Sequence, residues 1–151
     1  MELALMIERL SRDCQVLLWP LVDRTSRAVR LISPVRSWRR AFTNAFGDVL
    51  AAPPEAARRT LTWDHGSDMA RHDILAEHFE EGVFFADPGS PWQRGTNENT
   101  NGVLRQLFPK GKGLSIYTPK DLARAEKLLN NRPRKILNWR TPDRVFAHGL
   151  L

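Results

Sequence analysis

The order in which short apolar runs and helical patterns alternate limits this chain to one class of fold. The short runs have the length and composition of β-strands, and they occupy residues 14–22, 28–33, 60–63 and 82–86. Apolar residues at intervals of three and four, the period of a half-buried helix, recur over residues 38–50, 68–79, 95–108 and 118–131. This order predicts an α/β fold in which helices flank a small mixed β-sheet.

The 151 residues of the chain are enough for one buried core. Charge is unevenly distributed along them. The net charge is +3 over residues 1–50, −5 over residues 51–104 and +8 over residues 105–151. A basic region after an acidic middle is typical of a protein that holds a polyanion with Lys and Arg and cations with carboxylates. An ordinary solvated surface is the alternative, and charge alone does not decide between the two.

The cysteine and hydropathy patterns indicate a protein of the cytoplasm. Cys14 is the only cysteine, so no intramolecular disulfide can form, and no histidine has a cysteine partner at zinc-ligand spacing. Charged residues interrupt the apolar start of the chain, and no later run approaches the roughly 18 apolar residues of a membrane span. We therefore expect a soluble, unexported protein with no membrane association.

Two carboxylates, Asp64 and Glu98, lie in settings that suit a metal site. Asp64 directly follows the strand pattern at residues 60–63, and Glu98 lies near the start of the helix that follows Gly95, with 33 residues between the two acids. Mg²⁺ prefers oxygen ligands, and two such ions held by carboxylates from separate elements can activate a water or a 3′-hydroxyl for attack on a phosphodiester. The alternatives are a turn role for Asp64 and, for Glu98, a first-turn acid that complements the helix dipole.

Three segments carry distinctive sequences. They read Leu-Thr-Trp-Asp-His-Gly-Ser-Asp-Met-Ala at residues 61–70, Ser-Pro-Trp-Gln-Arg-Gly-Thr-Asn-Glu-Asn at residues 90–99, and Leu-Asn-Asn-Arg-Pro-Arg-Lys-Ile-Leu-Asn-Trp-Arg-Thr-Pro at residues 129–142. These segments closely resemble the bacterial transposases of the insertion-sequence-thirty family, which belong to the DDE superfamily together with the retroviral integrases.

The resemblance implies an RNase H-like catalytic core for metal-dependent DNA cleavage and strand transfer in transposition. Asp64 matches the second metal-binding Asp of the family, and Glu98 matches the metal-binding Glu. The family also implies a two-metal site for Mg²⁺ or Mn²⁺, transposon ends and target DNA as partners, a homo-oligomer, and a place at the nucleoid of the bacterial cytoplasm.

Cationic and amide side chains around these segments are candidate DNA contacts. In a regular helix, Asn101 and Arg105 lie one and two turns beyond Glu98 on the same face. The full set of candidates is Arg94, Asn101, Arg105, Lys110, Lys112, Arg132, Arg134 and Lys135. Contacts to phosphates predict salt-dependent DNA binding, and a plain solvated face is the alternative for any single one of them.

The resemblance ends before about residue 21, upstream of which the family carries its first catalytic Asp. We divide the chain into a divergent amino-terminal segment, residues 1–20, and a partial integrase-type catalytic core, residues 21–151, with a basic carboxyl-terminal helix and tail. Glu8 lies nearest the expected position and is the candidate third metal ligand, although its longer side chain would shift the metal. Asp23 is the weaker substitute.

Because the first catalytic Asp has no match, we expect an amino-terminally truncated or frameshifted transposase with impaired catalysis. The sequence leaves open whether this chain is an active enzyme. One competing hypothesis is a non-catalytic DNA-binding or oligomerisation fragment that modulates an intact transposase. Another is a stand-alone RNase H-type nuclease, which explains the carboxyl-terminal segment poorly.

Overall fold

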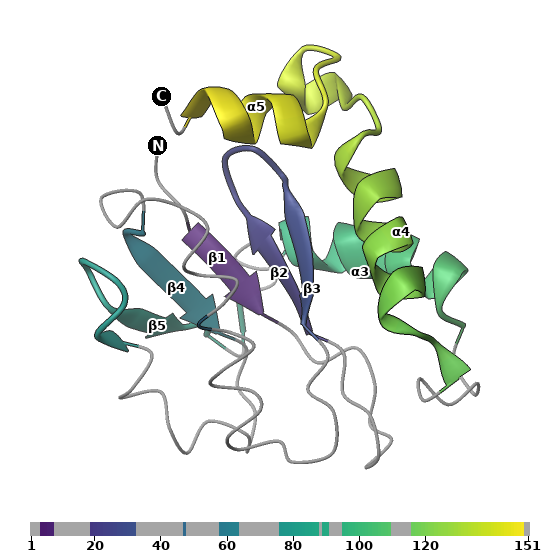
Figure 1. The fold of residues 1–151 in the computed structure, drawn as a ribbon. Helices are drawn as coiled ribbons and strands as arrows, with labels where there is room; N and C mark the ends of the chain where they lie inside the picture. Colours follow the sequence, from purple (N-terminus) through teal and green to yellow (C-terminus); the bar gives the residue numbers. More distant parts are fainter. Residues whose placement is uncertain are drawn as a thin grey trace.

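A mixed β-sheet forms the centre of the molecule. The computed structural model describes residues 4–7, 19–32, 47, 58–63, 76–87, 89–90, 95–109 and 116–149. Within these residues, five strands form one sheet in the order β3-β2-β1-β4-β5 (Figure 1). The strands are β1 (Ala4–Ile7), β2 (Trp19–Asp23), β3 (Val29–Ile32), β4 (Thr60–Trp63) and β5 (Val83–Phe85). The pairs β1–β2 and β2–β3 are antiparallel, whereas β1–β4 and β4–β5 are parallel, so the predicted mixed sheet is confirmed.

Helices lie against the β2–β3 part of the sheet. They are α3 (Gly95–Leu107), α4 (Pro119–Asn130), the short 3₁₀ helix η4 (Lys135–Leu137) and α5 (Pro142–Gly149). Helix α3 contacts β2, α4 lies beside β3, and α5 lies over the turn of the β2–β3 hairpin (Figure 1). A capping box between Thr118 and Asp121, with Pro119 in the first turn, explains why α4 begins where it does.

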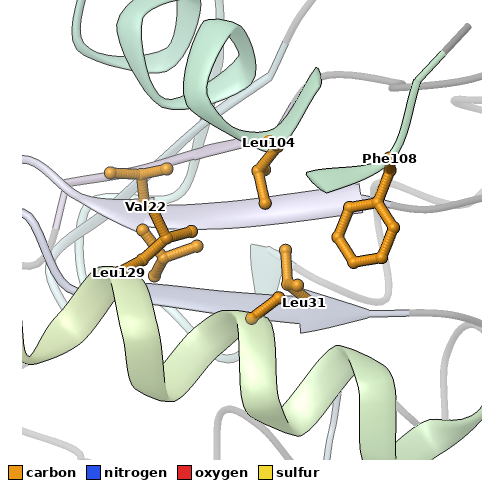
Figure 2. Close-up of a cluster of buried hydrophobic side chains, with 7 residues drawn as sticks. Val22, Leu31, Leu104, Phe108 and Leu129 are labelled. Atoms are coloured by element: carbon orange, nitrogen blue, oxygen red, sulfur yellow. The ribbon is translucent and has the colours of Figure 1, made fainter. Parts of the chain in front are cut away.

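The hydrophobic core lies between the β2–β3 hairpin, α3 and α4 (Figure 2). Its buried members are Val22, Val29, Leu31, Leu104, Phe108, Ala125 and Leu129. Leu104 and Phe108 are four positions apart, as are Ala125 and Leu129. The end of α3 with the residue that follows it, and α4, therefore each present one apolar stripe. The ring of Phe108 meets the ring of Tyr117 edge to face, with 4.8 Å between centroids, and this contact joins the end of α3 to the start of α4.

Side chains of α4 bond directly to the backbone of β3, the edge strand of the described sheet. The Asn130 Oδ1 atom accepts a hydrogen bond from the Val29 N–H at 2.8 Å, and its Nδ2 atom donates to the Val29 carbonyl at 2.9 Å. The Glu126 carboxylate accepts from the Leu31 N–H. Helix α4 therefore satisfies backbone groups that a further strand would otherwise bond, and these bonds fix its position along β3.

The turn of the β2–β3 hairpin is held by Asp23. Its carbonyl accepts a hydrogen bond from the Arg27 N–H at 2.8 Å, and its N–H donates to the Ala28 carbonyl at 2.9 Å. The Asp23 carboxylate accepts from the Ser26 N–H at 2.8 Å and from the Ser26 hydroxyl. These bonds hold Arg27 in the left-handed region, at a φ of 64°, where a side chain costs roughly 1–2 kcal/mol.

Most of the predicted elements that the structure describes are confirmed. They are the strands at residues 28–33, 60–63 and 82–86 and the helices at residues 95–108 and 118–131, each matched to within one residue at either end. Strand β2 begins at Trp19, and residues 14–18 of the predicted strand lie outside the described residues. The same holds for most of the predicted helices at residues 38–50 and 68–79. Residues 77–79 form turns and bends instead of the predicted last helical turn.

Three elements of the described structure have no counterpart among the predicted ones: β1, the short helix η4 and α5. Strand β1 lies within residues 1–20, the segment that the sequence sets apart as divergent, and it occupies the middle of the sheet. Helix α5, like η4, lies in the predicted tail, and it begins at Pro142, a residue type that suits the first turn of a helix. In the part of the chain that the structure describes, no helix has the length and apolar character needed to cross a membrane.

We expect Asn130→Ala to lower the free energy of unfolding by about 2–4 kcal/mol, because the N–H and the carbonyl of Val29 are both left buried without a partner. Urea unfolding followed by circular dichroism measures the change. Asn131→Ala is the matched control, because this exposed side chain only donates to the Lys127 carbonyl at the helix end, and a loss within about 0.5 kcal/mol is expected. Equal losses for the two variants would contradict the role given to Asn130.

The Glu126 carboxylate gives the stability of α4 a predictable pH dependence. Burial raises the pKa of Glu126, against opposing effects of the Leu31 N–H and the Arg30 charge. The pKa of Glu126 is therefore higher in the folded chain than in the unfolded chain. The protonated side chain contributes fully to the free energy of unfolding below pH 4.5, its ordinary pKa, and this contribution is lost as the pH rises through the folded pKa. Glu126→Gln keeps an acceptor for Leu31 but does not titrate. The parent should therefore lose stability relative to this variant between pH 4 and pH 7 in urea unfolding, and a constant difference would contradict the assignment.

Candidate functional site

The carboxyl ends of β1 and β4 lie side by side in the middle of the sheet. These parallel strands pair in a register that sets Ile7 opposite Trp63, the last residue of each strand. The next residues in the sequence are Glu8 and Asp64, and both lie outside the described residues. Two of the three predicted metal ligands thus follow directly from neighbouring strand ends.

Glu98, the remaining predicted ligand, lies in the first turn of α3, and its side chain is exposed. The buried side of this helix carries Thr100 and Leu104, which are 4% and 0% exposed, and Phe108, 3% exposed, directly follows its end. Glu98 therefore takes no part in core packing, and its carboxylate is accessible to an ion. Among the described residues, no group of three or more His, Cys, Asp or Glu side chains could hold a metal ion.

The predicted DNA contacts divide between two places. Asn101 and Arg105 follow Glu98 along α3 and are half-buried. Arg132 and Arg134 lie in the segment that joins α4 to η4, and Lys135 is the first residue of η4. Of these, Arg132 and Lys135 are exposed and Arg134 is half-buried. The other candidates, Arg94, Lys110 and Lys112, lie outside the described residues.

The segment around Arg134 is held by its own backbone. The Arg134 N–H donates to the Arg140 carbonyl at 3.1 Å, and the Arg134 carbonyl accepts from the N–H groups of Leu137 and Trp139 at 3.0 and 2.9 Å. Asn138 and Trp139 both adopt left-handed conformations, with φ of 53° and 61°, which turn the chain sharply after η4. The basic side chains of this segment therefore extend from a closed turn.

A cavity of about 380 Å³ joins this basic segment to α3 and to the hairpin turn. Its lining residues are Arg27, Gly95, Thr96, Asn99, Thr100, Arg134, Lys135 and Ile136. Arg27 Nη1 donates a hydrogen bond to Thr96 Oγ1, which connects the turn to the first turn of α3. The sequence patterns do not identify Arg27 as a candidate binding residue. Its hydrogen-bond partner, Thr96, lies 69 positions away along the chain, and nothing in the local sequence of the turn indicates that contact.

Asp23, the weaker substitute for the first carboxylate, has a structural role. Its side chain is 1% exposed, and both carboxylate oxygens accept hydrogen bonds from the turn, Oδ1 from the Thr25 N–H at 3.4 Å and Oδ2 from Ser26. A carboxylate that accepts several bonds within its own turn has little capacity left for an ion. Glu8 therefore remains the better candidate for the first ligand.

Comparison with known proteins identifies relatives over most of the chain. It is 46% identical over 130 residues to the transposase for insertion sequence element IS1086 of Cupriavidus metallidurans, a match that covers 86% of this chain and 38% of that protein. It is 42% identical over 130 residues to transposase InsI for insertion sequence element IS30A of Escherichia coli K12, covering 86% of this chain and 34% of that protein. The chain thus spans about a third of the length of these curated relatives. No family model matches it.

Solved structures show the same fold. The catalytic core domain of BIV integrase superposes with a TM-score of 0.70 at 14% identity, covering 99% of this chain and 96% of that one. A chain of the simian T-cell lymphotropic virus intasome in complex with PP2A regulatory subunit B56 gamma gives a TM-score of 0.70 at 16% identity, covering 96% of this chain and 54% of that one. The predicted RNase H-like fold is therefore confirmed.

Proposed function

We infer that this chain, a homologue of the IS30-family transposases over 86% of its length, carries the catalytic core for metal-dependent DNA cleavage and strand transfer in transposition. The core would span residues 21–151, with β1 completing its sheet. The observation that supports this most is the register of β1 and β4, because it sets the residues before Glu8 and Asp64 opposite each other on neighbouring strands.

The donor set fits Mg²⁺ or Mn²⁺. Asp64 and Glu98, with Glu8 as the third candidate, offer only carboxylate oxygens, the ligands that hard divalent cations prefer. When bound, two such ions activate the attacking oxygen and stabilise the charge that develops on the phosphodiester. The chain's own part is to bring carboxylates from two strand ends and one helix to the same phosphodiester.

The basic side chains would hold the DNA against these carboxylates. Asn101 and Arg105 continue along α3 from Glu98, while Arg132, Arg134 and Lys135 form a second basic group after α4. We also assign Arg94, Lys110 and Lys112 to DNA from the sequence. Contacts of this kind position the duplex through its phosphates and make binding strongly dependent on salt.

The partners and the place of action follow from this function. Transposon ends and target DNA would be the substrates, and bringing two ends together requires a homo-oligomer. A chain that acts on bacterial DNA would work in the cytoplasm, at the nucleoid.

We expect the purified chain to nick or join DNA carrying insertion-sequence ends only when Mg²⁺ or Mn²⁺ is present. Asp64→Asn or Glu98→Gln should reduce this activity by about 100-fold or more, because each variant removes a carboxylate that holds the ions. Gel assays of strand cleavage and strand transfer measure it. Glu77→Gln, the same charge change at an exposed residue, is the control. Salt-sensitive DNA binding with no metal-dependent cleavage would instead support the non-catalytic fragment.

The identity of the first ligand can be tested by a gain of activity. Glu8 carries one methylene more than the Asp of the family, and a displacement of about 1 Å at a reacting centre can cost on the order of 100-fold in rate. Glu8→Asp should therefore raise metal-dependent cleavage about tenfold or more, whereas Glu8→Gln should abolish what activity the parent has. If both substitutions left the rate unchanged, Glu8 would not be a metal ligand.

A further inference from the structure

The cavity between the hairpin turn, α3 and η4 is assembled from three parts of the chain that are far apart in sequence. Arg27 comes from the turn, four residues come from the first two turns of α3, and the rest are Arg134, directly before η4, with Lys135 and Ile136 of η4 itself. Glu98 is not among the lining residues, so the cavity lies to one side of the carboxylate proposed for catalysis.

The cavity gathers positive charge without a matching acid among its described lining residues. Arg27, Arg134 and Lys135 supply three cations, and Thr96, Asn99 and Thr100 supply neutral polar groups. Burial, together with the charges of Arg132 and Arg27, lowers the pKa of the Arg134 guanidinium. Two arginines that lie close enough to repel each other gain from an anion placed between them.

One nitrogen of Arg134 has no hydrogen-bond partner among the described residues. This Nε atom is buried, and an unsatisfied buried donor costs free energy. Arg134 lines the cavity and is half-buried, so an oxyanion there would accept hydrogen bonds from the guanidinium donors that face the cavity.

The backbones of the two arginines are fixed before any ligand arrives. Arg27 is held in its left-handed conformation by the bonds of Asp23, and its side chain is already oriented by Thr96. The Arg134 backbone is bonded to Arg140, Leu137 and Trp139. A site whose parts are already in place loses little conformational entropy on binding.

We propose that this cavity binds one phosphodiester of the DNA backbone, which Arg27, Arg134 and Lys135 hold jointly. This inference rests on the proposed function, because it takes DNA as the ligand. The phosphate held here is not the reacting one. Its role is to position the duplex on α3, on a side of the helix different from that of Glu98.

The first test measures DNA binding in the presence of EDTA, so that no cleavage takes place. Arg27→Gln, Arg134→Gln and Lys135→Gln should each weaken binding of a DNA duplex about tenfold at 0.1 M salt. Because one phosphate is shared, the triple variant Arg27→Gln with Arg134→Gln and Lys135→Gln should lower the slope of log K against log salt by about one, not by three. Arg144→Gln and Lys120→Gln remove exposed cations outside the cavity and are the matched controls.

Arg134→Lys guards against a merely structural effect. It keeps the charge but removes the paired donors, so its binding should fall between that of the parent and that of Arg134→Gln, with an unchanged urea midpoint. Cavity variants that bind DNA like the controls would overturn the inference, as would a triple variant whose slope falls by three.

A second test probes the cavity with inorganic phosphate and with an acidic peptide. Titration of phosphate into the full chain should shift the Nε–H resonances of Arg27 and Arg134 in ¹⁵N spectra, and the glutamine variants assign these signals. Absence of a shift, or a glutamate-rich peptide that displaces DNA from the cavity at lower concentration than phosphate does, would overturn the assignment to DNA. So would phosphate binding in a chain that binds no DNA.

Neither test depends on catalysis. If cleavage is absent while the cavity variants lose DNA binding, the proposed enzymatic function fails and the phosphate site stands. If cleavage requires Asp64 and Glu98 while the cavity variants bind normally, the phosphate site fails alone.

Discussion

The amide of Asn130 forms the pair of hydrogen bonds on which the arrangement of the carboxyl-terminal half depends. One side chain satisfies both backbone groups of Val29 on the edge strand, as a neighbouring strand would, and Glu126 adds a third bond one helical turn away. The adjacent residue, Leu129, is 1% exposed and packs into the core. Polar edge pairing and apolar packing therefore act at the same end of α4 and fix both its position and its rotation.

This docking determines where the basic segment lies. Asn130 is the last residue of α4, so the chain leaves the helix directly from the edge of β3 and places Arg134 and Lys135 beside α3 and the hairpin turn. The hairpin is closed independently by Asp23, which keeps Arg27 in a conformation that an unsupported arginine would rarely adopt. Positive charge from three parts of the chain converges because two sets of hydrogen bonds fix the backbone beneath it.

Sequence periodicity predicts the elements that combine a clear apolar pattern with a clear boundary. Strand β4 and helices α3 and α4 are of this kind, and the first-turn position of Glu98 follows from the start of α3. Strand β1 has only four residues and no turn residues beside it, so its local pattern is too short to identify a strand that long-range pairing stabilises. The start of helix α5 does have a signal in the sequence, the pair Thr141-Pro142. In the structure the Thr141 hydroxyl accepts a hydrogen bond from the Arg144 N–H at 3.4 Å, and Pro142 lies in the first turn.

The proposed function requires two strand ends and the start of α3 to bring carboxylates to one divalent-cation site in an integrase-type core. The most direct test is a crystal structure of the full chain grown with Mn²⁺, in which anomalous scattering locates the ions. We expect Mn²⁺ bound by Asp64 and Glu98, with Glu8 in the same site. An ion bound elsewhere, for example at Asp23, or no ion at concentrations that support DNA cleavage, would contradict it.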